Sequence, residues 1–192
     1  MFDLCAECGN EILGYLDKVD QGSNFIYKYL GNDESIAAVI RQFPEAGFVI
    51  SPDNPAIRET LANLYLIKQV HFPSIISLQS KVSKSAIIGS GTIIQYGVFV
   101  SANVRIGSFV KLNVYSNLMH DVQIGDYTTI APNAAIMGRV SIGNRCYIGA
   151  NSTIKQELQI CDDVIIGAGA VVTKDITETG TYIGVPAKGP AW

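Results

Sequence analysis

Aliphatic residues recur at every sixth position along the second half of the chain. Seventeen successive positions spaced by six carry only Ile, Leu or Val: Ile76, Val82, Ile88, Ile94, Val100, Ile106, Leu112, Leu118, Ile124, Ile130, Ile136, Ile142, Ile148, Ile154, Ile160, Ile166 and Val172. The residue two places before each of them is Ser, Ala, Thr, Val or Cys, with Leu158 as the only larger one. A six-residue period rich in glycine and β-branched residues does not fit an amphipathic helix, whose apolar positions recur every three or four residues.

This period predicts a parallel β-helix over residues 73–192, ending in a short tail. Side chains two positions apart share one face of a strand, so each hexad points one large and one small residue inward before the chain turns. Three hexads close a triangular coil of eighteen residues, and stacked coils form three parallel sheets. At roughly 4.8 Å per coil, just under six coils give a prism about 27 Å tall.

A regular prism has almost no concave surface of its own. A ligand site on it therefore needs a neighbouring subunit, a second domain or a protruding loop. We expect a cyclic homotrimer, with grooves between adjacent prisms.

Residues 1–72 lie before the six-residue period and have a different pattern of apolar residues. The segments Glu11–Asp17 and Gly47–Ser51 read as buried strands, and Asp33–Arg41 and Asn54–Tyr65 read as helices. The second helix begins with an Asp-Asn-Pro start signal. Alternating strands and helices predict a small α/β domain with a parallel sheet.

Composition narrows the class of protein. Of the 192 residues 48% are hydrophobic and 16% charged, which argues against disorder, and the net charge of −3 argues against a non-specific nucleic-acid binder. The apolar stretch Val164–Val172 is too short to span a bilayer, and the acidic start MFDLCAECGNE lacks the apolar core of an export signal. We expect a cytoplasmic protein without a membrane span.

Cysteine and histidine counts give little support to a metal site. The four cysteines do not suggest a disulfide framework, and Cys5 and Cys8 form a C-x-x-C pair with no second pair at zinc spacing. Only two histidines exist, His71 and His120, whereas a γ-type carbonic anhydrase needs three on zinc. We therefore expect no metal.

Four segments carry a resemblance to a known family: LNVYSNLMHDVQIGDYTTIAP, IGNRCYIGANSTI, IGAGAVVTKDI and GVPAK. With them the chain resembles the left-handed β-helix sugar acetyltransferases that modify bacillosamine precursors, perosamine and sialic acid, over nearly its whole length. The resemblance implies a left-handed coil, acetyl-CoA as co-substrate and a Rossmann-like α/β nucleotide-sugar domain ahead of the β-helix. The residues EILGYLDK look like the second strand of that domain.

The resemblance also implies roles for individual residues. His120 matches the family's catalytic base, followed by the acidic Asp121, which orients the imidazole. Asn113 matches an asparagine that contacts substrate or supports the base, and Gly138 matches a backbone N–H aimed at the thioester oxygen. A histidine in a repeat protein is often only a solvated corner residue. However, His120 lies two places past Leu118 and uses neither inward position, which favours the catalytic role.

Coenzyme A contacts follow from the same resemblance. Ala150 and Ala168 match positions whose backbone lines the pantetheine arm, and Lys188 in the tail is a candidate for a phosphate of the coenzyme. Family members carry a second histidine near the cofactor where this chain has Thr129, which can donate a hydrogen bond but cannot titrate. We read His71, at the predicted domain junction, as structural or interfacial.

The N-terminal domain departs further from the family. The family's domain begins with a strand and a glycine-rich phosphate loop, whereas this sequence starts about where the following helix ends. Asp17 is then a candidate for a ribose or base contact and Lys18 for a phosphate contact. We expect weaker nucleotide-sugar affinity than in relatives that have the loop.

The function implied is N-acetylation of the amino group of a nucleotide-linked 4-amino-4,6-dideoxy sugar in glycan biosynthesis. The alternatives are O-acetylation of a sialic acid or another sugar hydroxyl, which the same base would serve, and a non-catalytic β-helix scaffold. A panel of amino and hydroxy sugars with acetyl-CoA separates the three.

Overall fold

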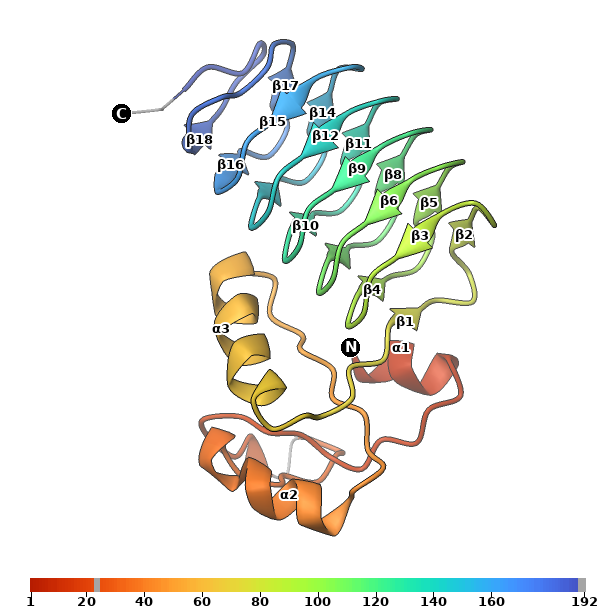
Figure 1. Cartoon of the computed structure of the whole chain (residues 1–192), viewed down its shortest axis with the longest axis vertical. Coiled ribbons are helices and arrows are strands. Elements are labelled where there is room, and N and C mark those ends of the chain that lie inside the picture. Colours follow the sequence, from red (N-terminus) through yellow and green to blue (C-terminus); the bar gives the residue numbers. More distant parts are fainter. Residues whose placement is uncertain (23–24, 190–192) are drawn as a thin grey trace.

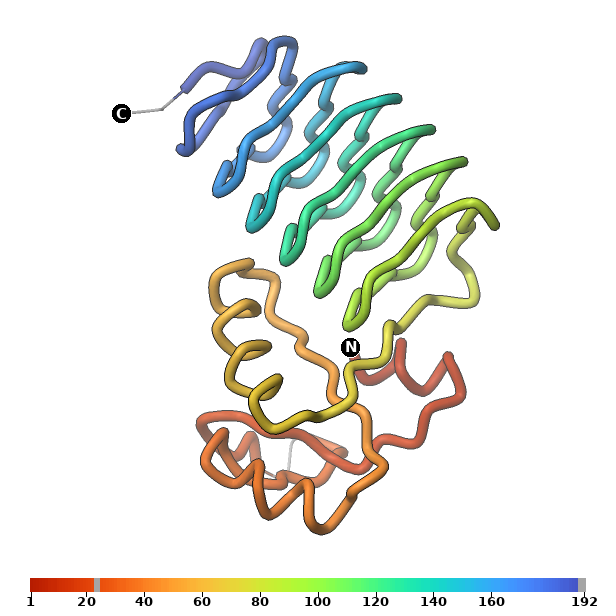
Figure 2. The backbone as a smooth tube through the Cα atoms, viewed as in Figure 1, coloured from red at the N-terminus to blue at the C-terminus, as the bar shows by residue number. Residues whose placement is uncertain are grey.

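The computed structural model describes residues 1–22 and 25–189, so the last three residues of the predicted tail lie outside the described residues. The chain forms a three-sided parallel solenoid, with an N-terminal region of short helices at its first end and α3 (Pro55–Leu66) lying beside the next coils (Figure 1). The tube view shows the coils stacked one above the other along a single axis (Figure 2). The predicted parallel β-helix is confirmed; its left hand stays an implication of the resemblance.

Three parallel sheets form the sides of the prism. Sheet 1 contains β1 (Ile75–Ile76), β4 (Ile93–Ile94), β7 (Lys111–Leu112), β10 (Thr129–Ile130), β13 (Tyr147–Ile148), β16 (Val164–Ile166) and β18 (Gly180–Tyr182). Sheet 2 contains β2 (Lys81–Val82), β5 (Phe99–Val100), β8 (Asn117–Leu118), β11 (Ala135–Ile136), β14 (Thr153–Ile154) and β17 (Val171–Val172). Sheet 3 contains β3 (Ile87–Ile88), β6 (Arg105–Ile106), β9 (Gln123–Ile124), β12 (Ser141–Ile142) and β15 (Gln159–Ile160).

The strand register follows the hexad period. Ile130 pairs with Ile148 in sheet 1 and Leu118 with Ile136 in sheet 2, so partners are eighteen residues apart, one coil. All four of these side chains are fully buried. The inward aliphatic and small residues together form one continuous core along the prism axis, as the sequence predicts.

The corners depend on residues in the left-handed backbone region. In the central coils the turning residue has φ near +60°, at Asn103, Phe109, Tyr115, Asp121, Tyr127, Asn133, Arg139, Arg145, Asn151, Glu157 and Asp163. Asparagine and aspartate tolerate this region, whereas a bulky residue such as Phe or Tyr adopts it only when its surroundings hold it there. Each corner therefore places one side chain at a fixed, repeated position on an edge of the prism.

The helices with given bounds in the described part of the N-terminal region are α1 (Phe2–Glu7), η2 (Asp33–Ser35), α2 (Ile36–Gln42) and α3 (Pro55–Leu66). Asn54 caps α3 by accepting a hydrogen bond from the Ile57 N–H, with Pro55 at the first helical position. The start signal in the sequence thus predicted α3 correctly. None of the helices in the described residues is long and apolar enough to cross a bilayer.

The two predicted N-terminal strands were wrong as continuous strands. Within the described residues, Glu11–Asp17 and Gly47–Ser51 contribute only isolated parallel bridges, from Tyr15 to Tyr29 and from Gly47 to His71. Much of both segments is only partly buried, so they lack the two covered faces that a parallel sheet needs. The described N-terminal residues therefore do not form a Rossmann-like sheet, and the boundary after residue 72 stays a prediction.

Candidate active site

His120 and Asp121 occupy the corner between β8 and β9, on the edge shared by sheets 2 and 3. The imidazole Nδ1 is 2.8 Å from Asp121 Oδ2, and the two side chains are 52% and 44% exposed. The left-handed backbone of Asp121, with φ of 60°, turns its carboxylate back toward the ring. The carboxylate thus orients the imidazole, while Nε2 has no hydrogen-bond partner within the described part of the chain.

Gly138 lies one coil beyond His120 and directly beside its ring. A Cβ placed on Gly138 would lie 2.6 Å from His120 Nε2, so a larger residue would displace the imidazole. Among the described residues the Gly138 N–H donates to no backbone acceptor, while its carbonyl accepts from the Glu157 N–H. A ring nitrogen that can accept a proton and an N–H that can donate a hydrogen bond are therefore neighbours.

A column of corner residues supports Asp121 from the adjacent coils. Asn103, one coil earlier, donates from Nδ2 to Asp121 Oδ1 at 3.1 Å, and Arg139, one coil later, pairs with Glu157. Hydrogen bonding from His120, then from Asn103, lowers the pKa of Asp121 below its usual range. The carboxylate is consequently ionised at neutral pH, with both of its oxygens fixed.

A second polar cluster lies on sheet 1, where the N-terminal region meets the β-helix. Asp53 Oδ1 is 3.0 Å from Lys111 Nζ and accepts from Asn113 Nδ2 at 3.1 Å. Burial would raise the pKa of Asp53, but the hydrogen bonds from Lys111 and Asn113 outweigh it and lower the pKa. The predicted substrate residue Asn113 is thus buried against the N-terminal region of its own chain.

Arg58 of α3 connects the N-terminal region to the prism. Its fully buried guanidinium donates to the carbonyl oxygens of Phe109, Tyr127 and Pro52 and to Thr129 Oγ1. Burial lowers the pKa of Arg58 to about 10, so the side chain stays charged at neutral pH. Thr129, predicted to contact coenzyme A, is fully buried in this contact and does not lie beside His120.

The other predicted coenzyme A residues follow a different edge of the prism. Ala150 and Ala168 lie one coil apart on the edge shared by sheets 1 and 2, where the Gly169 N–H donates to the Ala150 carbonyl. Lys188 is exposed in the tail and pairs through its backbone with Ile183. The structure therefore brings His120 and Gly138 together, but separates them from these residues by the width of sheet 2.

The predicted nucleotide contacts lie apart from both edges. Asp17 is exposed, and its carboxylate accepts hydrogen bonds from the Lys18 N–H and from Gln21 Nε2. The side chain of Lys18 is also exposed. Neither residue is brought to His120 within this chain.

Sequence reasoning missed Asn103, Asp53 and Arg58. Asn103 had a detectable signal, because it lies eighteen residues before Asp121 and the coil period stacks the two. Asp53 and Arg58 had no such signal in the sequence, because the residues that they contact on the β-helix are far away along the chain. No group of three or more His, Cys, Asp or Glu that could hold a metal ion occurs among the described residues.

Comparisons with known proteins agree with this architecture. Residues 103–138 match the model described as "Bacterial transferase hexapeptide (six repeats)", and residues 139–174 match "Hexapeptide repeat of succinyl-transferase". A search of curated proteins gave no match.

Solved structures resemble the chain over almost its full length. WeeI from Acinetobacter baumannii AYE is 30% identical with a TM-score of 0.84, and the match covers 91% of this chain and 84% of WeeI. The acetyltransferase domain of PglB from Neisseria gonorrhoeae FA1090, in complex with acetyl coenzyme A, is 28% identical with a TM-score of 0.88 (97% and 90% covered). PerB from Caulobacter crescentus, in complex with CoA and GDP-perosamine, shares the fold at 24% identity and a TM-score of 0.90 (97% and 89% covered).

Proposed function

Since the chain belongs to the hexapeptide-repeat acetyltransferase family and is therefore an acyltransferase, we propose that it acetylates the amino group of a nucleotide-linked 4-amino-4,6-dideoxy sugar. The observation that carries this proposal is the His120–Asp121 pair seated against Gly138 on an exposed edge. Acetyl coenzyme A is the co-substrate; PglB binds it, and PerB binds CoA together with a nucleotide-linked amino sugar.

The site residues fit direct transfer of the acetyl group. As the acceptor amine attacks the thioester carbonyl, His120 Nε2 takes the proton that the nitrogen loses. Asp121 holds the Nδ1 side of the ring and stabilises the imidazolium that forms. The C–N bond forms, the C–S bond breaks, and the departing thiolate takes up the proton that the imidazole held.

Gly138 supplies the remaining element of this mechanism. The thioester oxygen gains negative charge during the attack, and a backbone N–H placed beside it lowers the barrier without rearranging. The Gly138 N–H lies next to His120 and is free of a backbone acceptor in the described chain, which suits this role.

A homotrimer would complete the site. His120 and Gly138 lie on the edge between sheets 2 and 3, whereas Ala150 and Ala168 follow the edge between sheets 1 and 2. Packing these two edges against each other across a subunit interface would place coenzyme A beside the base. We expect light scattering to give three times the chain mass of 20.7 kDa, and a monomer would contradict this arrangement.

The test of the function is an assay of acetyl transfer from acetyl-CoA to a panel of nucleotide-linked amino and hydroxy sugars. The reaction is monitored by the free thiol that coenzyme A releases. We expect turnover with an amino sugar and a fall of about 10²–10⁴-fold in the His120→Ala variant. His71→Ala is the matched control, because His71 is exposed and outside the coils, and it should retain activity. Native turnover in His120→Ala would overturn the assignment of the base.

A further inference from the structure

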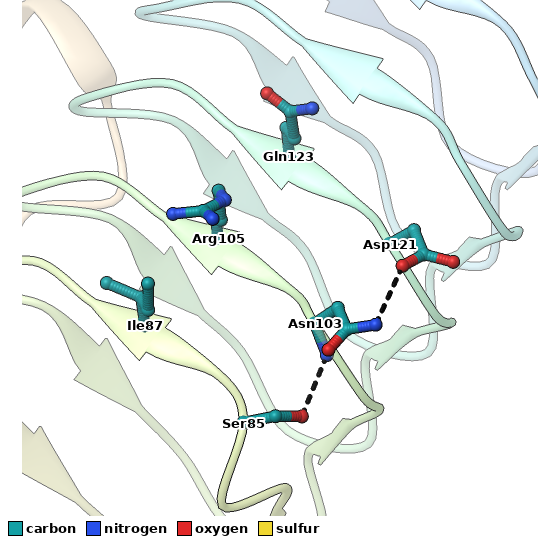
Figure 3. Close-up of a pocket in the computed structure, with 6 residues that line it drawn as sticks. All are labelled: Ser85, Ile87, Asn103, Arg105, Asp121 and Gln123. Atoms are coloured by element: carbon teal, nitrogen blue, oxygen red, sulfur yellow. Dashed lines mark hydrogen bonds between the residues drawn. The ribbon is translucent and has the colours of Figure 1, made fainter.

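The edge of the prism that carries His120 also carries a column of polar side chains from successive coils. The members of the column lie at intervals of eighteen residues: Ser85, Asn103, Asp121, Arg139 and Glu157. Figure 3 shows the first three of them, where the Asn103 N–H donates to Ser85 Oγ at 3.0 Å and Asn103 Nδ2 donates to Asp121 Oδ1 at 3.1 Å. The column therefore runs through the carboxylate that orients the imidazole.

Arg139 stands between two carboxylates, one on the coil before it and one on the coil after it. Its Nε donates to Glu157 Oε1 at 3.0 Å, and its Nη2 donates to the same oxygen. Within the described chain it donates no hydrogen bond to Asp121, whose two oxygens are bound to His120 and Asn103. Its charge nevertheless helps these two hydrogen bonds to lower the pKa of Asp121. The guanidinium thus lies close enough to Asp121 to act on it, but is held by the other acid.

Backbone hydrogen bonds join the same residues to the candidate base. The Arg139 N–H donates to the His120 carbonyl at 2.9 Å, and the Glu157 N–H donates to the Gly138 carbonyl at 3.0 Å. The side chains of Arg139 and Glu157 are both more than half exposed, so no packing fixes them apart from their ion pair. A guanidinium released from Glu157 would remain one coil, about 4.8 Å, from the corner that carries Asp121.

We propose that Glu157 is a positioning residue, which holds the Arg139 guanidinium away from Asp121 and so leaves Asp121 Oδ2 to His120. Arginine binds a carboxylate with two parallel hydrogen bonds, so a released guanidinium would compete with the imidazole for this oxygen. Nδ1 would then lose the acceptor that keeps the proton on it, and the neutral ring would shift toward the tautomer protonated at Nε2. That tautomer cannot act as the base. The inference rests on the proposed function in its use of Nε2 as the proton acceptor.

The test is a double-variant cycle with two readouts, the tautomer of the neutral His120 ring and turnover. Long-range ¹H–¹⁵N NMR distinguishes a proton on Nδ1 from one on Nε2, and the chain has only one other histidine, His71, which serves as the internal reference. Glu157→Gln should increase the Nε2–H tautomer of His120. Turnover should fall about tenfold, less than on removal of an orienting aspartate, because solvent and salt screen an exposed guanidinium.

The second change in the cycle separates positioning from support of the fold. Adding Arg139→Gln to Glu157→Gln removes the competing cation, so both readouts should return most of the way to their native values. Arg139→Gln alone should be affected less than Glu157→Gln. If the ion pair only supported the fold, the double variant would be no better than Glu157→Gln.

Asp163→Asn is the matched control. Asp163 pairs with Arg145, eighteen residues before it, on the edge shared by sheets 3 and 1, and the position one coil before Arg145 carries no carboxylate. This variant should keep the native tautomer of His120 and the native turnover.

A native His120 tautomer in Glu157→Gln, or no recovery in the double variant, would overturn the proposal. The tautomer is measured without substrate and is therefore independent of turnover. If it shifts and recovers as expected while no amino sugar is acetylated, Glu157 keeps its positioning role and the proposed function fails.

Discussion

Strands of the β-helix pair with strands one coil before and after them, whereas the described N-terminal residues before the prism make only isolated bridges. The stability of the β-helix therefore comes from repeated backbone pairing around one apolar core. The N-terminal region instead depends on particular side chains, above all on Arg58, which donates to the carbonyls of two corner residues. Because the same pairing repeats in every coil, the β-helix should tolerate many single substitutions, and its structure can be predicted from the sequence period. The N-terminal region depends on contacts that occur once, so a single substitution there should have a large effect.

The core of the β-helix can be tested by removing one inward side chain. Ile130→Ala should cost about 4 kcal/mol in the free energy of unfolding, because a fully buried aliphatic side chain leaves a cavity. Urea denaturation measures the loss. The control is Ile165→Ala, at an outward position of the same sheet that is 47% exposed, where a change below about 1 kcal/mol is expected. Equal losses in the two variants would contradict the register.

The N-terminal region can be broken at one residue. Arg58→Met keeps much of the side-chain volume but leaves the buried carbonyls of Phe109 and Tyr127 without a donor, at a cost of about 3 kcal/mol. Hydrogen exchange should then speed up in α3 while the amides of the prism stay protected. Arg41→Met, at an exposed position of α2, should leave exchange unchanged. Faster exchange throughout the β-helix would mean that the two regions unfold as one unit.

A smaller effect is expected at the corner beneath Asp121. Asn103→Ala forces alanine into a backbone with φ of 60°, at a cost of about 1 kcal/mol, and also removes the hydrogen bond to Asp121. Asn103→Gly removes the same hydrogen bond without the backbone cost. Both variants should lower turnover several-fold, but only Asn103→Ala should lower the melting temperature. Native turnover in Asn103→Gly would show that Asn103 supports the backbone alone.

The smallest expected effect is a pH dependence of the stability of the N-terminal region, caused by the titration of Asp53. Its pKa lies below its unfolded value, so its stabilisation is present above about pH 4 and is lost as the pH falls through the lowered pKa. Because this side chain is 55% exposed, solvent screening limits the effect to a few tenths of a kcal/mol. Exchange of α3 amides at pH 3 and pH 6 measures it. In the Asp53→Asn variant, the α3 amides should be equally protected from exchange at pH 3 and at pH 6, once the intrinsic pH dependence of exchange is subtracted.

The sequence predicted the prism, its coil length, its inward residues and the helix α3, because each of these follows from a local period or a local start signal. The roles of His120, Asp121 and Gly138 came from the family resemblance and stay a prediction, although the structure does place Gly138 directly beside the His120 ring, one coil later. The sequence did not predict that Thr129 lies under Arg58. That contact joins residues 71 positions apart, and no local pattern encodes it.

The N-terminal strands failed for a related reason. Glu11–Asp17 and Gly47–Ser51 have apolar residues at strand-like spacing, but a strand also needs a partner along its length. Each segment meets a partner at a single bridge in the described chain. An apolar pattern indicates that one side of a segment is buried, but it does not indicate whether another strand pairs with that segment.

The columns of outward side chains have a consequence for how this protein can change during evolution. Arg145 meets Asp163 through two hydrogen bonds of 2.7 Å, although eighteen residues separate them in the chain. A mutation that removes one partner leaves its mate exposed on the next coil, so inherited substitutions should covary at that spacing more strongly than between sequence neighbours. In an alignment of relatives, the strongest covariation among outward residues should therefore join positions eighteen residues apart.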